Sequence, residues 1–170
     1  MKIFQHSKLL FLIVLFSAAF FDACRNVETS ESTPSKDAHG YDSKVYTTWN
    51  HLFMDMERYA KGYRPGPAPR ALGYVGFAAY EAVAPGMPEY NSLANLYNGL
   101  DVPRYDETLE YHWPTVINAP RAYLMPRFFI NATPAQLQSI NGLEAFYDDR
   151  GKQAVGEEVW SRSKDYGKAV

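Results

Sequence analysis

The sequence predicts an all-α fold, a helix bundle of about five helices that forms an incomplete domain. Over residues 43–170, apolar residues recur at spacings of three and four, the pattern of amphipathic helices. The alternation of polar and β-branched residues that marks a strand never runs longer than a few positions. Clusters of proline and glycine divide the helical pattern into separate segments.

The composition excludes several classes of function. The chain carries 17 Lys+Arg against 19 Asp+Glu and has no basic stripe, so we expect no nucleic-acid partner. Its single cysteine excludes an internal disulfide, a cysteine-rich zinc site and an iron–sulfur cluster. The fractions of apolar residues (46%) and charged residues (21%) are those of a globular protein.

Residues 1–23 are predicted to be a lipoprotein signal peptide. Lys2 and Lys8 precede an apolar run over residues 9–21, which has the length of a signal-peptide core and is short for a bilayer span. The pair Ala23-Cys24 then resembles a bacterial lipobox, with Phe21 and Asp22 departing from its usual pattern. The resemblance implies lipid on Cys24 and a lipid membrane as partner. The chain would be exported and anchored in the cell envelope, in the periplasm or outer membrane. The alternative is an ordinary secretory peptide with a free cysteine.

Residues 24–42 are predicted to be a disordered tether. Serine, threonine, glutamate and proline dominate this segment, and it has too few apolar residues to form a core.

The first helix is predicted over residues 43–61. Its apolar residues fall on one stripe, and charged residues fill the other face. The stripe contains Val45, Trp49, Leu52, Phe53, Met56 and Ala60. Prolines and glycines in residues 62–70 end the helix.

The second helix, over residues 69–84, is apolar on nearly every side, so we expect it in the middle of the bundle. Arg70 and Glu81 are its charged residues, and a spacing of three turns places them on one face. Because buried charges need partners, both are candidates for a structural role or for a supporting role beside a pocket.

The remaining helices are marked by their ends. Residues 86–113 are mixed, with a short helical piece near 91–98, and the third helix covers 114–128 with possible kinks at Pro120 and Pro126. Thr133 begins the fourth helix with a capping box, and Gly151 closes it. The fifth helix starts near residue 152, and its apolar stripe still includes Val170. We therefore expect the chain to be the front part of a longer protein.

No catalytic or metal-binding constellation is predicted. His51 and Asp55 are one helical turn apart and could supply two metal ligands, but an exposed pair of side chains is the preferred interpretation. His112 is interpreted as a packed histidine. The acidic cluster at 148–149 is expected to be solvated, with a surface cation site as the alternative. Nucleophile elbows, phosphate loops and dinucleotide-binding motifs are absent from the sequence.

One stretch carries a resemblance to a known family. Residues 64–100 read RPGPAPRALGYVGFAAYEAVAPGMPEYNSLANLYNGL. The stretch contains a proline-rich break, an alanine-rich helix with Ala-Tyr-Glu-Ala-Val, then Pro-Gly and a Ser-Leu…Asn-Gly-Leu segment. In this order of features it looks like the N-terminal part of bacterial proteins in the vanadium-dependent haloperoxidase and type 2 phosphatidic acid phosphatase superfamily. The resemblance extends over about 43–170.

The resemblance implies an all-α fold and an oxyanion pocket built from three later motifs. These are a Lys followed six residues on by Arg-Pro, a Pro-Ser-Gly-His, and a Ser-Arg followed five residues later by His. None occurs here: Arg64-Pro65 follows Lys61 at the wrong distance, and Ser161-Arg162 is followed by Lys168. The chain is therefore expected to hold no catalytic residue and no cofactor. Vanadate and the remaining C-terminal half of the domain would belong to the full-length parent.

Two other classes of protein stay open. A non-catalytic, SusD-like outer-membrane glycan-binding lipoprotein would share the lipobox, the tether and the abundance of Tyr and Trp (13 and 3). A small stand-alone helical lipoprotein would require that translation stop after Val170.

Overall fold

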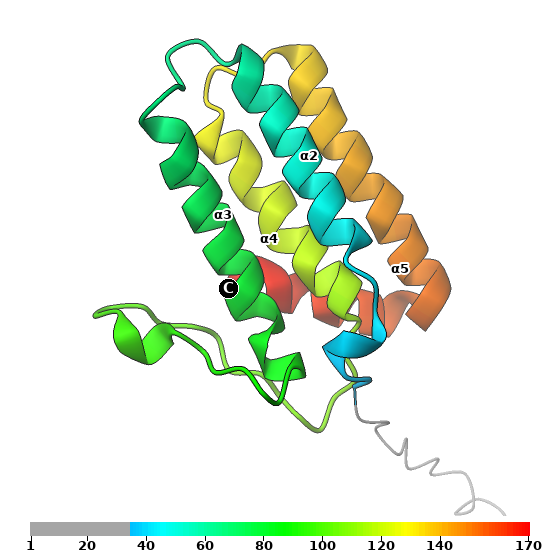
Figure 1. The fold of residues 1–170 in the computed structure, drawn as a ribbon. Coiled ribbons are helices and arrows are strands. Elements are labelled where there is room, and N and C mark those ends of the chain that lie inside the picture. The colour runs from blue at the N-terminus through cyan, green and yellow to red at the C-terminus, as the bar shows by residue number, and fades with distance from the viewer. Residues whose placement is uncertain (1–34) are drawn as a thin grey trace, which may run out of the picture. The chain divides into compact units, whose positions relative to one another are not determined.

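The computed structural model describes residues 35–170, and this part of the chain is helical with irregular connections and no strand (Figure 1). Its long helices are α2 (Lys44–Tyr59), α3 (Pro67–Val83), α4 (Trp113–Phe128) and α5 (Pro134–Ala169). Short 3-10 turns cover Ala38–Gly40, Ala84–Gly86 and Ala94–Leu96. The prediction of an all-α bundle is confirmed. The predicted signal peptide and Cys24 lie outside the described residues.

Helix α4 is the central helix of the bundle, because it packs against α2, α3 and α5 (Figure 1). Its buried residues lie around most of its circumference and include Trp113, Val116, Asn118, Arg121 and Met125. The helix continues through Pro120 and Pro126. No helix in the described range combines the length and apolarity needed to cross a bilayer.

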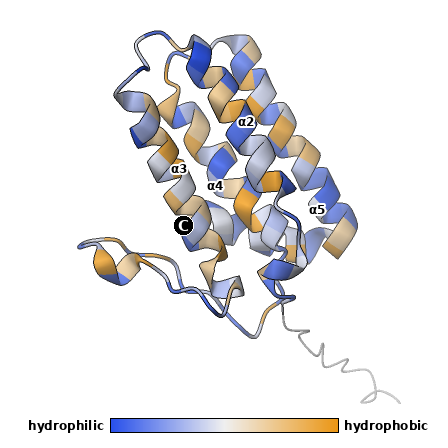
Figure 2. Ribbon diagram, in the orientation of Figure 1, coloured by the Kyte–Doolittle hydropathy of each residue, from blue (hydrophilic) through white to orange (hydrophobic). Residues whose placement is uncertain are grey.

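The prediction that helix 69–84 is central is wrong. Helix α3 buries one side, including Val75 and Ala79, and leaves Leu72 and Tyr74 exposed. Four of its five alanines are buried, whereas large apolar side chains stay on the exposed side, so apolar residues on both sides of the helix do not mean that both sides are packed. Figure 2 shows apolar residues along α3 and in the nearby turn Ala94–Leu96.

Helix α2 follows its predicted stripe. Val45, Trp49, Phe53 and Met56 are buried, and the last three are almost completely shielded from solvent. Phe53 packs edge-on against Phe129, with ring centroids 5.1 Å apart. The 3.6-residue period therefore identified the buried face of this helix from the sequence.

Helix α5 begins as the sequence predicts. The Thr133 hydroxyl accepts from the Gln136 N–H at 3.3 Å, and the Gln136 side chain accepts from the Thr133 N–H at 2.9 Å. These reciprocal bonds are the predicted capping box.

The predicted end of this helix at Gly151 is wrong. Gly151 is helical and buried, and a Cβ there would lie 2.4 Å from the Thr115 hydroxyl. The helix breaks instead at Gly156, whose φ of 78° and ψ of 173° favour glycine. The chain then runs across the end of the bundle (Figure 1), where Gly167 lies against the backbone of Val116. Gly156 thus permits the break in the helix, and Gly151 and Gly167 permit close packing.

Residues 35–42 contact the helices, although the sequence predicts a tether as far as residue 42. The Ser35 hydroxyl accepts from the Tyr111 N–H at 2.7 Å, and the Trp113 indole donates to the Lys36 carbonyl at 2.7 Å. Tyr41 packs edge-on against the His112 ring. The described body therefore begins before residue 43, through main-chain hydrogen bonds that composition does not reveal.

Candidate functional site

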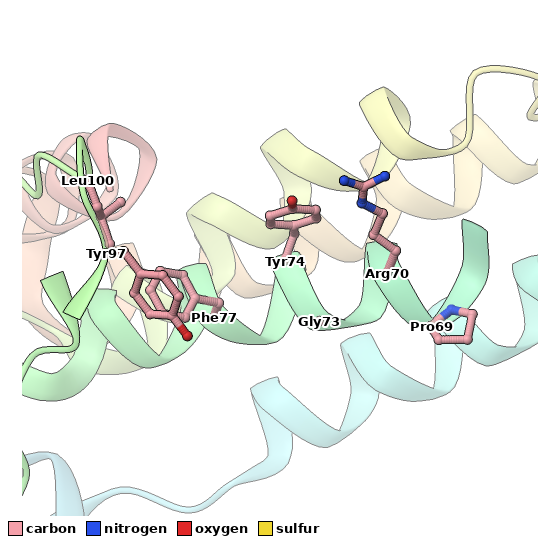
Figure 3. Close-up of a pocket in the computed structure, with 7 residues that line it drawn as sticks. All are labelled: Pro69, Arg70, Gly73, Tyr74, Phe77, Tyr97 and Leu100. Atoms are coloured by element: carbon pink, nitrogen blue, oxygen red, sulfur yellow. The ribbon is translucent and has the colours of Figure 1, made fainter. Parts of the chain in front are cut away.

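A groove runs along the outer side of α3, between this helix and residues 97–100 (Figure 3). Its cavity volume is about 450 Å³, within the range of small-molecule sites. We call it the α3 groove. It is lined by Pro69, Arg70, Gly73, Tyr74, Phe77, Tyr97 and Leu100. Its surface is mostly apolar, and Arg70 is the charged side chain among these residues.

Helical spacing explains why these residues share a surface. Arg70, Gly73, Tyr74 and Phe77 are three, four and seven positions apart, and such residues lie on one face of a helix. A Cβ at Gly73 would meet nothing within 4 Å, so this glycine leaves room in the groove. Tyr97 closes one end by packing edge-on against Phe77, with ring centroids 5.4 Å apart.

A second hollow adjoins the α3 groove and shares Tyr74, Phe77 and Leu100 with it. Its cavity volume is about 210 Å³, and it extends towards Glu81 and Phe128. Tyr74 stacks on Phe128, with an interplanar angle of 9° and centroids 6.0 Å apart. The two hollows form a mostly apolar surface along α3.

Glu81 is 1% exposed and holds the segment that follows α3. Its carboxylate accepts from the Ser92 hydroxyl at 2.6 Å and from the Leu93 N–H at 2.8 Å. The neighbouring Tyr80 hydroxyl donates to the Asn91 carbonyl at 2.6 Å. The expected partner for a buried charge is therefore present, and it consists of a hydroxyl and a main-chain amide instead of a cation.

Arg70 differs from Glu81, because its side chain is exposed and does not meet Glu81. Both residues line hollows on the same side of α3, as the spacing predicts. Residues 91–93 cover the end of the helix that carries Glu81. The guanidinium of Arg70 lies 5.9 Å from the centroid of the Tyr74 ring.

His51 and His112, for which the sequence predicts no catalytic role, differ in their exposure to solvent. His51 and Asp55 are both exposed on α2. His112 is buried, its Nδ1 lies 2.8 Å from the Thr115 hydroxyl, and burial lowers the pKa of its imidazole. His112 is thus a packed histidine, as predicted. Within residues 35–170, no three His, Cys, Asp or Glu side chains are placed to hold a metal ion.

The expectation that the cluster at 148–149 is solvated is wrong for Asp148. Asp148 is buried and accepts from the Asn118 amide at 3.2 Å and the Trp160 indole at 3.3 Å. Lys164 forms an ion pair with it. The break at Gly156 makes this possible, because it brings residues 160 and 164 back against the first part of α5.

Arg121 is a buried residue that sequence reasoning missed. Its Nη1 donates to the Asn50 side chain at 2.7 Å, and its guanidinium lies 4.1 Å from the Tyr46 ring centroid. Burial lowers the pKa of Arg121. Its Nε and Nη2 have no hydrogen-bond partner within the described part of the chain. The available signal was an arginine between apolar neighbours in the middle of a helix, with Ala119 before it and Ala122 after it.

The residues of the α3 groove do not fit vanadate or phosphate. Such an oxyanion needs several converging donors and a histidine. The groove supplies one cationic side chain and no histidine among its lining residues. Comparisons of the chain with protein-family models, curated proteins and solved structures find no match.

Proposed function

We propose that this chain is the N-terminal helical part of a lipid-anchored haloperoxidase- or phosphatase-like protein of the bacterial cell envelope. The observation that carries the proposal is the contact between Glu81 and the Ser92-Leu93 segment. Glu81 belongs to the Ala-Tyr-Glu-Ala-Val part of the resemblance, and Ser92-Leu93 belongs to its Ser-Leu part.

This contact gives a physical reason for the two parts to occur together. A carboxylate inside an apolar helix is costly unless hydrogen-bond donors reach it. The donors come from a segment beyond the Pro85-Gly86 break, and Tyr80 adds a bond to Asn91. The Ala-Tyr-Glu-Ala-Val and Ser-Leu segments of the resemblance thus contact each other in one structural unit. This contact favours a shared fold over a chance similarity of composition.

In the proposed parent, residues 35–170 serve as scaffold, and later sequence supplies the oxyanion-binding motifs. Cationic side chains there would neutralise the oxyanion, and a histidine would act as nucleophile or ligand. The parent would hydrolyse phosphomonoesters or oxidise halides with vanadate. Both reactions use one kind of oxyanion pocket, so this segment serves either.

The sequence encoded after Val170 provides the first test. Pro-Ser-Gly-His and a Ser-Arg followed five residues later by His would support the proposal. A continuation that lacks these motifs, or a stop codon, would contradict it and favour a stand-alone helical lipoprotein.

The chain by itself is expected to have no phosphatase or haloperoxidase activity, because it lacks the donor set that such a pocket requires. Loss of one oxyanion donor can reduce the rate by about 10² to 10³. The measurement is turnover of a chromogenic phosphate ester, and then of bromide and peroxide with vanadate. Turnover that persists through purification and disappears in His112→Ala or His51→Ala would show that a histidine interpreted as structural is catalytic.

Cys24 is expected to carry the membrane anchor, because acyl chains contribute about 0.8 kcal/mol per buried methylene. The chain expressed in a bacterium should sediment with the membranes, and Cys24→Ser should move to the soluble fraction. Equal partition of both forms would contradict lipidation.

The alternative, a glycan-binding lipoprotein, is favoured by one observation. Tyr74 and Tyr97 are half exposed along the α3 groove, where aromatic faces could contact a sugar. Saturable binding of a soluble oligosaccharide that is lost in Tyr97→Ala would support this alternative.

A further inference from the structure

We propose that the α3 groove binds an aliphatic monocarboxylate, with the carboxylate at Arg70 and the chain directed towards Phe77, Tyr97 and Leu100. This inference goes beyond the proposed function, because it concerns a site unconnected to the oxyanion motifs. The order of the lining residues suggests the direction: Arg70 lies beside Pro69 towards one end of the row in Figure 3, and Tyr97 and Leu100 lie towards the other.

The lining favours an apolar chain. Six of the seven lining residues carry no formal charge, and three of these have aromatic rings. Tyr97 is 57% exposed and Tyr74 is 51% exposed, so part of their apolar surface contacts water in the described body. Covering such surface with a hydrocarbon chain is favourable in proportion to the area removed from water. The adjoining hollow extends the apolar surface past Phe77 and Leu100.

Charge complementarity selects the head group. Within residues 35–170, no carboxylate forms an ion pair with Arg70. A guanidinium presents paired N–H donors that match the two oxygens of a carboxylate. One cation without a further donor cluster favours a monoanion.

The length of the site agrees with this orientation. Arg70 and Phe77 are seven residues apart, which corresponds to about 10 Å along a helix. A medium-length alkyl chain covers this distance when extended. Gly73 lies between the two ends, and its missing side chain leaves the middle of the groove open.

The test uses the full chain and a dodecanoate that carries a photoreactive diazirine at the end of its alkyl chain. After irradiation, mass spectrometry locates the crosslinked residues. The expected adducts lie on the peptides that contain Phe77, Tyr97 and Leu100. The corresponding diazirine alcohol, which has no charge, should give about tenfold less adduct at these positions.

Variants separate the charge from the shape of the site. Arg70→Gln should reduce the adduct yield about tenfold, and Arg70→Lys should retain part of it. Arg58→Gln removes an exposed arginine of α2 outside the groove and is the matched control, with an unchanged yield expected.

A second pair tests the shape without changing charge. Gly73→Leu should fill the groove and abolish crosslinking, whereas Gly73→Ala, which adds one methyl group, should retain most of it. A Cβ at this position meets nothing within 4 Å, and both variants remove a glycine from the interior of α3. Both should therefore keep the circular dichroism of the parent chain, and neither should lower its melting temperature.

Three outcomes would overturn the proposal. Equal adduct yields from the carboxylate and the alcohol would show a non-specific apolar surface. Adducts outside the groove peptides would place the ligand elsewhere. Yields unaffected by Arg70→Gln and Gly73→Leu would show that crosslinking depends neither on the charge of Arg70 nor on the open middle of the groove.

Discussion

Ala79→Glu should lower the free energy of unfolding of the described body by several kcal/mol. Ala79 is 2% exposed on the packed side of α3. A carboxylate there would be larger than the space allows and would lack the donors that Ser92 and Leu93 provide to Glu81. Burial of an unpaired charge and overpacking are both strongly destabilising. Urea denaturation followed by circular dichroism measures the effect.

Leu72→Glu is the matched control, because it places the same charge on the exposed side of the same helix. Its cost should stay below about 1 kcal/mol, as for most surface substitutions. Similar large losses in both variants would place α3 in the interior after all. A loss below about 0.5 kcal/mol for Ala79→Glu would place both sides of α3 at the surface.

Asp148→Ala should lower the free energy of unfolding by about 3 kcal/mol. The substitution removes the acceptor shared by Asn118, Trp160 and Lys164. The cost comes mainly from leaving buried donors without partners. The lysine retains Glu144, with its Nζ 2.8 Å from the carboxylate, and this limits the effect.

Asp149→Ala provides the control for this second prediction. Asp149 is adjacent in sequence and exposed, so its removal should change stability by less than about 0.5 kcal/mol. Chemical denaturation of the two variants in parallel gives the comparison. If Asp148→Ala costs no more than Asp149→Ala, the hydrogen bonds at Asp148 do not hold the two parts of α5 together.

The sequence predicts those elements whose stability depends on local pattern. The buried stripe of α2 follows from spacing, and the start of α5 follows from Thr133 and Gln136, which bond each other across three residues. These features need no knowledge of distant contacts. Where a helix packs, by contrast, depends on every other helix, and the apolar composition of α3 did not reveal its place at the side of α4.

The glycines of α5 also show that local pattern alone does not predict tertiary contacts. Gly151 and Gly156 have identical chemistry, and either could end a helix. Gly151 is constrained by Thr115, which lies 36 positions away in the chain, whereas Gly156 has the positive φ. Choosing between them requires the tertiary contact that the sequence does not display.

The candidate site was predicted in part. Arg70 and Glu81 were conspicuous as charges in an apolar helix, and both lie beside hollows of α3. Glu81 is buried and Arg70 is exposed because the irregular segment after α3 covers only the end of the helix that carries Glu81. An irregular segment has no hydrophobic periodicity, so its path could not be predicted from the sequence. The packing of Arg121 beneath Tyr46 on a neighbouring helix was missed for a similar reason.

The break at Gly156 also bears on the order in which the bundle folds. The main-chain N–H of His112, at the start of α4, donates to the Ser163 hydroxyl at 2.8 Å, and Ser163 lies beyond the break. The partner of this amide at the start of the central helix is thus 51 positions later in the chain. Such closure carries an entropic cost that short-range helix formation does not. We therefore expect the N-terminal hydrogen bonding of α4 to be complete only once the chain beyond Gly156 has docked.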